Sequence, residues 1–434
     1  MHTPLAGPCR GAFAFLIALA FVLTAPVTAS TPPPVSVATV QPTWKQAPAN
    51  GRYFINSVAV TDDAGRVVGG TFFHYYPEGT RRSPINPGGV LTPPTEAGVY
   101  GIYCYSAAGT PLWKDEFIGW QGVYWVAISG DASGAMAGGQ MTKDAGFVRA
   151  YDGNTGRLLL DYATKTRVNQ VAMSRDGEWG ISAAETLILF RRVTAGAETF
   201  YVKKGEFTPG TANGGGIVCA SISADGTTIA YAGFDGEIGV LANDGAGQLT
   251  RRAHWKVPGD KGSDFCHMIS LSPDGQGFAA GGALGLFYYF DVASFVQSQQ
   301  PTITYDSKTA GSVYGVALAE DRSFLAGVVN DAEAGAVLLT PVNAKETPVL
   351  ERHALLRNPN SAAINAAHNL LVVADGHPDG TPGNFYCYDL NGGPTRLPRW
   401  TFQTGNMSWP IVIAANGAAI VGGSDDGSIY YFTP

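Results

Sequence analysis

The chain has 434 residues, with 28 basic and 35 acidic side chains and a formal net charge of −7. A mildly acidic chain without a run of like charge argues against nucleic acid and anionic membrane surfaces as partners. Charged residues make up only 15% of the chain while glycine occurs 56 times, a balance that is typical of many short turns joining buried strands.

Residues 1–29 have the pattern of a secretory signal peptide. Arg10 supplies a positive charge, residues 12–25 form an apolar core, and Val27 to Ala29 offer small side chains for cleavage. The apolar core is too short to span a bilayer as a helix. We therefore expect a secreted or periplasmic protein without a membrane span, in which residues 30–434 form one domain.

The next segment, Val35 to Lys45, reads as a β-stretch that stands apart from the repeats that follow. The last repeat stops at Pro434 after its third strand. Because an open ring would expose unpaired strand edges, we expect Val35–Lys45 to complete the final sheet.

From Asn56 onward one phrase returns eight times: an apolar strand, a tight turn and a second strand ending in small residues. Its anchor positions lie about 48 residues apart, except for a longer first interval; they are Val60, Ile128, Met173, Ile222, Leu271, Leu318, Ile364 and Ile413. Short strands at this period indicate an all-β fold, an eight-bladed β-propeller with four-stranded blades, closed by the N-terminal strand. A seven-bladed ring is the alternative.

Asp-Gly or Asn-Gly fills the turn in several copies, as at Asp176-Gly177 and Asp225-Gly226. These dipeptides predict two-residue hairpins, in which the aspartates shape the turn and bind no metal. Two longer loops, Pro77–Gly98 and Gly376–Gly383, occupy one slot between the second and third strands. We expect both to overhang the end of the channel where the inner strands begin.

Four cysteines follow the N-terminal segment. Cys104 and Cys387 occupy equivalent third-strand positions in repeats that are not neighbours, which excludes a bridge between them. Cys219 and Cys266 lie in adjacent repeats, so the sequence leaves open whether they form a disulfide or act as small buried hydrophobes.

The segment AYDGNTGRLLL, from Ala150 to Leu160, resembles the A-x-D-x-x-T-G-x-x-x-W signature of quinoprotein-like and WD40-like propellers, with Leu160 in place of the tryptophan. A second copy keeps that tryptophan as Trp113. The resemblance implies the fold more than the chemistry. Quinone-dependent relatives carry a vicinal cysteine pair and a calcium site, whereas this chain has no Cys-Cys. No cofactor is predicted, neither pyrroloquinoline quinone (PQQ) nor calcium.

Catalytic motifs are absent from the sequence: it has no G-x-S-x-G, P-loop or H-E-x-x-H. Asp375, His377 and Asp379 could ligate a divalent ion, but three such residues in a turn-rich loop are more often structural. No metal site is predicted, no catalytic residue is assigned, and the balance is against an enzyme.

The repeat alignment itself gives the candidate site. Where each inner strand enters the channel, most aligned residues are polar-tipped or aromatic, and the next positions on the same face are apolar. With the adjacent Trp125, the predicted ligand-binding residues at this channel mouth are Asn56, Tyr124, Trp125, Asn169, His267, Tyr314, Asn360 and Trp409. Arg167 and Asp264 lie near enough in sequence to join them. Such a ring suits a neutral polar or aromatic ligand, or else it satisfies strand ends and holds channel water.

Three function classes follow. The leading one is an exported, non-enzymatic propeller that binds a protein partner or a small ligand at the channel mouth. The second is a lyase, isomerase or hydrolase with His267 as a general base, and the third is a degenerate quinoprotein-type redox accessory protein. In each of them we expect the function to lie at the mouth rather than on the hairpin face.

Overall fold

The structure is a computed structural model of the chain. It describes residues 37–434, apart from 52, 74–98, 119–120, 143–144, 211–215, 259–265, 283–284, 309–310, 330–334, 343–350, 356, 378–379 and 393–396. The chain divides into two units, Met1–Ser36 and Val37–Pro434, and the description below concerns the second. The expected signal peptide and the loop at 77–98 therefore lie outside the described residues.

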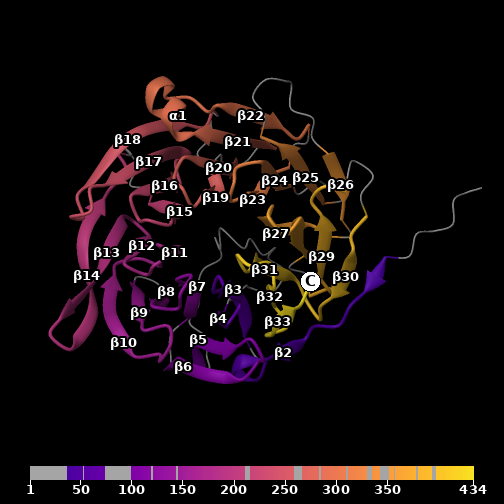
Figure 1. Ribbon diagram of the computed structural model, residues 1–434, viewed down its shortest axis with the longest axis horizontal. Helices are drawn as coiled ribbons and strands as arrows, with labels where there is room; N and C mark the ends of the chain where they lie inside the picture. The colour runs from indigo at the N-terminus through magenta and orange to yellow at the C-terminus, as the bar shows by residue number, and fades with distance from the viewer. Residues whose placement is uncertain are drawn as a thin grey trace, which may run out of the picture. The chain divides into compact units, whose positions relative to one another are not determined.

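Nearly all regular structure in the described residues is β-strand, and each of the eight predicted copies begins with one (Figure 1). We call the eight groups of strands repeats 1 to 8. Repeats 1 and 2 hold β3 (Phe54–Val60), β4 (Arg66–Phe72), β5 (Val99–Ser106), β6 (Pro111–Ile118), β7 (Gly122–Ile128), β8 (Ala135–Thr142), β9 (Ala145–Tyr151) and β10 (Leu158–Thr164). Repeats 3 and 4 hold β11 (Gln170–Met173), β12 (Trp179–Ala183), β13 (Leu187–Ala195), β14 (Glu198–Phe207), β15 (Ile217–Ile222), β16 (Thr228–Gly233), β17 (Glu237–Asn243) and β18 (Leu249–Lys256).

The second half continues the pattern. Repeats 5 and 6 hold β19 (Cys266–Leu271), β20 (Gly277–Gly282), β21 (Leu286–Asp291), α1 (Val292–Ser298), β22 (Ile303–Asp306), β23 (Val313–Leu318), β24 (Phe324–Val329), β25 (Ala336–Pro341) and β26 (Glu351–Ala354). Repeats 7 and 8 hold β27 (Pro359–Asn365), β28 (Leu370–Asp375), β29 (Asn384–Asp389), β30 (Trp400–Gln403), β31 (Ser408–Ile413), β32 (Ile420–Ser424) and β33 (Ile429–Phe432). Ahead of them lie β1 (Ala38–Thr39), β2 (Trp44–Gln46) and the 3-10 helix η1 (Pro48–Gly51).

Consecutive strands of a repeat pair antiparallel, so each repeat forms a small sheet. Repeats 1 and 2 join into one sheet through a single pairing of Phe72 with Gly122. The inner strand of each repeat contacts the inner strand of the next, and β3 contacts β31 and β32 of the last repeat. Figure 1 shows these inner strands facing a common centre.

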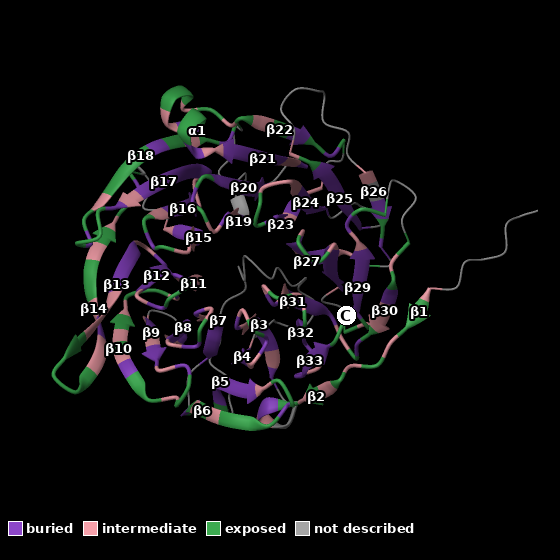
Figure 2. Ribbon diagram, in the orientation of Figure 1, coloured by how far each residue is buried: buried purple, intermediate pink, exposed green. Residues whose placement is uncertain are grey.

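Burial follows the position of a strand within its repeat (Figure 2). The second strand β12 is buried along its whole length, whereas the outer strand β18 is mostly exposed. This gradient arises because the inner strands pack between neighbouring repeats on both faces, while the outer strand faces water along one edge. Cys104 and Cys387 are buried free thiols, which confirms that they are not bridged to each other.

Small residues at the end of the second strand let neighbouring repeats approach closely. A methyl group added at Gly138 would lie 2.5 Å from Cγ1 of Val168 and 2.8 Å from Cγ1 of Val171, both from repeat 3. Gly70 stands in the same relation to two valines of repeat 2. The repeated glycines in the sequence therefore mark contacts between repeats, which are packed too tightly for a larger side chain.

The hairpins between the first two strands differ from the two-residue loops that the sequence predicted. In repeat 3, Ser174 N donates to Trp179 O, so four residues lie between the closing pair, and Gly177 alone among them has a left-handed φ of +67°. The prediction failed because the serine at the start of the loop closes a wider turn with its side chain. Its Oγ accepts from Trp179 N (2.9 Å) and donates to Asp176 Oδ1 (2.7 Å).

Successive hairpins are also linked to each other through the backbone. Asn416 N donates to Asp62 O, Asp62 N to Gly130 O, Gly130 N to Arg175 O, Arg175 N to Ala224 O and Ala224 N to Pro273 O, all at 2.8–3.0 Å. These bonds join repeats 8, 1, 2, 3, 4 and 5 in order. They satisfy backbone groups of the hairpins that would otherwise lack a protein partner.

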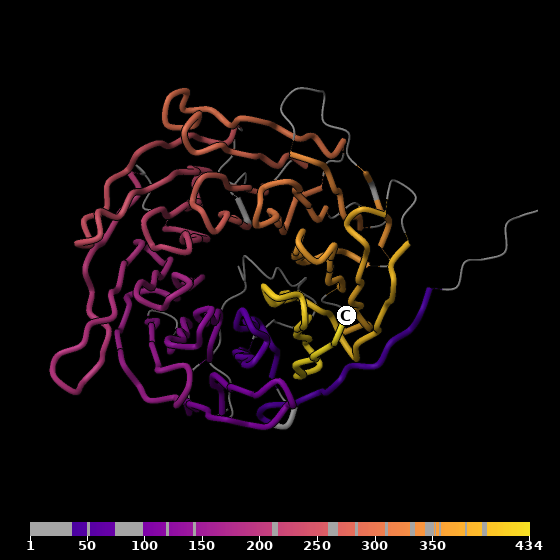
Figure 3. Tube along the Cα trace, viewed as in Figure 1, coloured from indigo at the N-terminus to yellow at the C-terminus, as the bar shows by residue number. Residues whose placement is uncertain are grey.

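The N-terminal segment joins two different sheets. β2 pairs antiparallel with β33 and becomes the fourth strand beside β31 to β33, while β1 pairs in parallel with β30 of repeat 7. Figure 3 shows this indigo segment running beside the yellow C-terminal strands. Within the Val35–Lys45 stretch singled out from the sequence, the residues paired with repeat 8 are therefore those at its end, from Trp44 onward.

Candidate functional site

The entry positions of the inner strands coincide with β-bulges. Of the eight inner strands that the structure describes, seven show a register shift against the second strand at this point. The residues that the register skips are Asn56, Tyr124, Val218, His267, Tyr314, Asn360 and, in β31, Trp409 with Pro410. A bulge re-aims its extra side chain and bends the strand, so these residues leave the in-and-out alternation that the sequence pattern assumed.

The asparagines at these positions hold the next repeat. Asn56 Nδ2 donates to Tyr124 O (2.7 Å), Asn169 Nδ2 to Ile217 O (2.9 Å) and Asn360 Nδ2 to Ser408 O (2.7 Å). Each bond runs from one repeat to the inner strand of the following repeat. The amide donors that were predicted to bind a ligand are therefore bound to backbone carbonyls. These asparagines satisfy strand ends, which is the alternative that the sequence left open.

The aromatic residues gather around one small pocket. It is lined by residues of repeats 2, 3, 4, 5 and 8: Tyr124, Trp125, Arg167, Asn169, Gln170, Val218, Cys219, Phe234, Met268 and Trp409. Trp409 belongs to the same apolar cluster as Val218 and Cys219 and is only 6% exposed. The enclosed space is ≈ 20 Å³, which is room for about one water molecule.

Arg167 stands beside this pocket, on the connection between β10 and β11. Its guanidinium carbon lies 4.3 Å from the centroid of the Tyr124 ring, and its Nε donates to Asn169 Oδ1 at 3.1 Å. The Tyr124 ring also meets Phe72 edge-on, with 5.1 Å between the ring centroids. The sequence placed Arg167 near the mouth but gave no signal that it stacks on a tyrosine 43 positions away.

Three predicted features of the mouth fall outside the described residues. They are the His267 side chain, Asp264 and the loop at 77–98. Tyr314 is described, is partly buried and packs against the cluster that contains Trp409. Cys219 is a buried thiol that forms no disulfide, so it is not bridged to Cys266.

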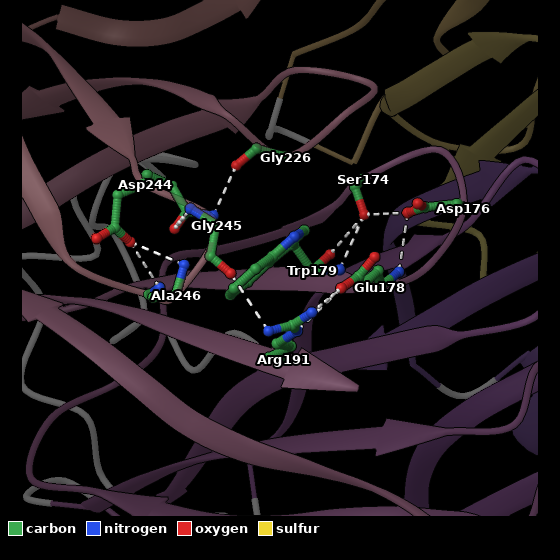
Figure 4. A network of polar contacts seen from close by, with 11 residues as sticks. Ser174, Asp176, Glu178, Trp179, Arg191, Gly226, Asp244, Gly245 and Ala246 are labelled. Carbon is green, nitrogen blue, oxygen red and sulfur yellow. Dashed lines mark hydrogen bonds and ion pairs between the residues drawn. The ribbon is translucent and has the colours of Figure 1, made fainter. Parts of the chain in front are cut away.

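The hairpin face places its carboxylates in turns (Figure 4). Asp176 Oδ1 accepts from Ser174 Oγ and from Glu178 N, while Arg191 lies over the Trp179 ring and binds Glu178. In repeat 1, hydrogen bonds from Thr61 Oγ1 and from Gly65 N lower the pKa of Asp63. These aspartates act as turn formers, as the sequence predicted.

The Asp375 to Asp379 segment is not an open ligand set in its described part. Asp375 is fully buried at the end of β28 and accepts from Tyr386 OH (2.6 Å), Asn384 Nδ2 (2.9 Å) and Arg357 N (3.0 Å). Burial raises the pKa of this carboxyl, which the three hydrogen bonds only partly offset. Asp379 lies outside the described residues. Among those the structure describes, no three His, Cys, Asp or Glu side chains are placed to hold a metal ion.

Comparison with solved structures identifies a WD40-like β-propeller fold. Sqt1 from Chaetomium thermophilum, solved bound to the N-terminus of the ribosomal protein L10, aligns with a TM-score of 0.64 and 14% identity over 88% of this chain and 97% of its own. Sqt1 from Saccharomyces cerevisiae aligns with a TM-score of 0.64 and 9% identity over 92% of this chain and 99% of its own. A chain of a mitotic checkpoint complex aligns with a TM-score of 0.56 and 13% identity over 96% and 99%.

At these identities the likeness concerns the fold alone. No known family and no curated protein matches the sequence. The quinoprotein-like side of the resemblance stays without support from these neighbours, which are WD40 β-propeller proteins.

The comparisons contradict the secreted or periplasmic location that residues 1–29 predicted. The structural neighbours are a protein solved with the N-terminus of a ribosomal protein and a chain of a mitotic checkpoint complex, and neither is a secreted or periplasmic assembly. An apolar run behind one arginine matches a leader by composition alone, and its residues are outside the described part of the chain. No helix in that described part is long and apolar enough to cross a bilayer.

Proposed function

We propose that residues 37–434 form an eight-bladed propeller closed by β2. The eight repeats support eight blades rather than seven, and the pairing of β2 with β33 gives repeat 8 its fourth strand. Trp44 of β2 contacts repeat 1 in the way that another tryptophan joins repeats 1 and 2. Its ring would lie 2.8 Å from a methyl group added at Gly109, and its Nε1 donates to Ala107 O at 3.0 Å.

The equivalent contact joins repeats 1 and 2. Trp113 of the outer strand β6 covers Gly156 in the same manner, and its Nε1 donates to Gly153 O at 2.8 Å. Because β6 is the fourth strand of its own repeat, the likeness supports β2 as the fourth strand of repeat 8. The joint between repeats 8 and 1 would then be built as the joint between repeats 1 and 2 is.

We further propose that the propeller is a non-enzymatic protein that binds a protein partner at the channel mouth. The observation that carries this proposal is the size of the mouth pocket. The enclosed part of this pocket, ≈ 20 Å³, is far smaller than the cavities of hundreds of Å³ in which small ligands are usually bound. This supports a partner that rests on the mouth surface, where Trp125 and Tyr314 are partly exposed.

The structural neighbours agree with a surface of this kind, since Sqt1 was solved bound to the N-terminus of the ribosomal protein L10. The enzymatic alternative depends on His267, and no observation favours it. The quinoprotein-type alternative likewise gains nothing, because the described residues offer no group of metal ligands.

The test is native mass spectrometry of the full chain purified from its own host, followed by cross-linking. We expect a stoichiometric protein partner whose cross-links fall near Trp125 and Tyr314 rather than near the hairpins around Asp176 and Asp225. A chain that carries a bound compound of low mass and no protein would refute the proposal and favour the small-ligand alternative. Cross-links confined to the hairpin face would refute the assignment to the mouth.

A further inference from the structure

Arg167 is fixed in orientation from two sides. Its guanidinium lies over the Tyr124 ring at 4.3 Å, and its Nε is bound to Asn169 Oδ1. Asn169 is held in turn, because its Nδ2 donates to Ile217 O of the next repeat. These contacts use the ring face and the Nε of the guanidinium and leave its two terminal nitrogens, Nη1 and Nη2, as an ordered pair of donors.

The other cations that lie over aromatic rings among the described residues also hold an acid. The pairs are Lys45 over Tyr430 with Asp426, Arg149 over Phe117 with Asp115, Arg191 over Trp179 with Glu178, Lys203 over Tyr162 with Glu206, and Arg251 over Phe207 with Glu237. Arg167 departs from this pattern: within the described chain it has the ring and the asparagine but no carboxylate.

The surroundings of Arg167 favour an anion as its missing partner. The pocket beside it is lined by aromatic, apolar and amide side chains, and Arg167 is the one charged residue among them. Its amides are already bound, since Gln170 Oε1 accepts from Ala220 N at 3.1 Å. A planar guanidinium with two free donors matches the two oxygens of a carboxylate, and the low polarity around it strengthens such a bond.

We propose that Arg167 binds a carboxylate of the protein partner, with an apolar or aromatic residue of that partner resting on Trp125, which is partly exposed. This inference rests on the proposed protein-binding function. The neighbouring pocket holds about one water, so it cannot enclose a free carboxylic acid. The anion must therefore be presented by a larger molecule that covers the mouth.

The test uses synthetic peptides as probes, with the full chain and isothermal titration calorimetry. The acidic probe is acetyl-Gly-Glu-Phe-Glu-Phe-Glu-Gly-amide, and its neutral counterpart has glutamine in place of each glutamate. We expect the acidic peptide to bind at least about tenfold more tightly than the neutral one, since a hydrogen bond to a charged group contributes a factor of this order. The difference should shrink as salt is added.

Two arms identify the source of the carboxylate. The glutamine peptide with a free C-terminus asks whether a chain end suffices, and glutarate asks whether a free small acid does. Binding of glutarate as tight as that of the acidic peptide would overturn the assignment to a protein partner. Equal binding of the acidic and neutral peptides, or no binding of either, would overturn the proposal as a whole.

Variants separate recognition from folding and from net charge. Arg167→Met should abolish the preference for the acidic peptide, while Arg167→Lys should keep part of it, since lysine preserves the charge but not the planar fork. Arg157→Met removes the same charge from an exposed residue of the hairpin-side turn in repeat 2 and should change nothing. Melting curves of all three variants establish that they fold.

The outcome stays distinct from that of the proposed function. If the natural partner binds Arg167→Met as tightly as it binds the original chain, the carboxylate proposal is wrong and the protein-binding function stands. If purification yields no protein partner, the function itself fails, whatever the peptides do.

Discussion

Replacing Trp44 with alanine tests whether the ring is closed by β2. Trp44 stacks on Tyr431 of its own sheet, with 5.1 Å between ring centroids, and lies 5.8 Å from Tyr105 of repeat 1. Its indole N–H donates to Ala107 O across the joint. The side chain therefore touches both of the repeats that must be held together.

The size of the effect follows from these contacts. Each aromatic pair contributes about 0.5–1.5 kcal/mol and the hydrogen bond about 1 kcal/mol. Trp44→Ala should therefore lower the free energy of unfolding by about 2–4 kcal/mol. With an unfolding entropy of about 2.1 cal/mol/K per residue over roughly 400 residues, this corresponds to a melting temperature lower by about 2–5 °C. Trp44→Phe keeps the ring contacts and should lose about 1 kcal/mol.

The measurement is thermal unfolding followed by circular dichroism, which does not depend on the indole that is removed. Trp113→Ala is the matched control, because Trp113 makes the same pair of contacts between repeats 1 and 2. Equal losses for Trp44→Ala and Trp113→Ala would be the result expected of a closed ring. A clear loss for Trp113→Ala with none for Trp44→Ala would show that the N-terminal strand does not hold the ring.

Three further predictions concern packing and protonation. Gly138→Ala should lower the free energy of unfolding by about 1–3 kcal/mol in urea titrations, since the added methyl meets two valines. Gly210→Ala is the control and should change it little, because the nearest atom to its added methyl is 4.0 Å away. Equal effects of the two substitutions would contradict the packing argument. Burial raises the pKa of the Cys104 and Cys387 thiols to about 12, so peptide mapping should find neither alkylated by iodoacetamide at pH 8 until urea is added. The pKa of Asp63 is below its ordinary 3.8, so its ionised form stabilises the fold above that pH and the contribution is lost as the pH falls through the lowered value. Asp63→Asn should remove this acid-dependent contribution, which solvent screening keeps under about 1 kcal/mol. An unchanged dependence of the unfolding free energy on pH would contradict it.

The repeat pattern predicted the strands well because its apolar and small residues are the ones that pack between neighbouring repeats. Each anchor residue, from Val60 to Ile413, lies in the first strand of its repeat, and the small residues that follow are the positions that valines of the next repeat press upon. The turn length was not readable, since a serine hydroxyl two residues before the aspartate widens the loop. Trp44 also escaped notice, because its partner strand lies at the other end of the chain.

The entries of the inner strands were predictable from the sequence, but the contacts that their side chains make were not. Aligning the copies located the strand entries correctly, yet a bulge at those entries turns residues such as Tyr124 and Asn360 out of the regular alternation. A single sequence does not record a bulge, since the inserted residue follows no period. The pairing of Arg167 with Tyr124 likewise depends on the packing of repeat 2 against repeat 3, which no local pattern encodes.

The backbone hydrogen bonds between successive hairpins all point in the same direction around the repeats, and the series ends at repeat 5. Every donor in the series from Asn416 to Ala224 bonds to a carbonyl of the following repeat, and one of these bonds joins repeat 8 to repeat 1. The series stops at Pro273 because proline has no backbone N–H to donate. Between repeats 5 and 6 the hairpins are linked instead by an ion pair, Arg322 Nη2 to Asp274 Oδ2 at 3.1 Å. This link, unlike a backbone hydrogen bond, should weaken as salt is added.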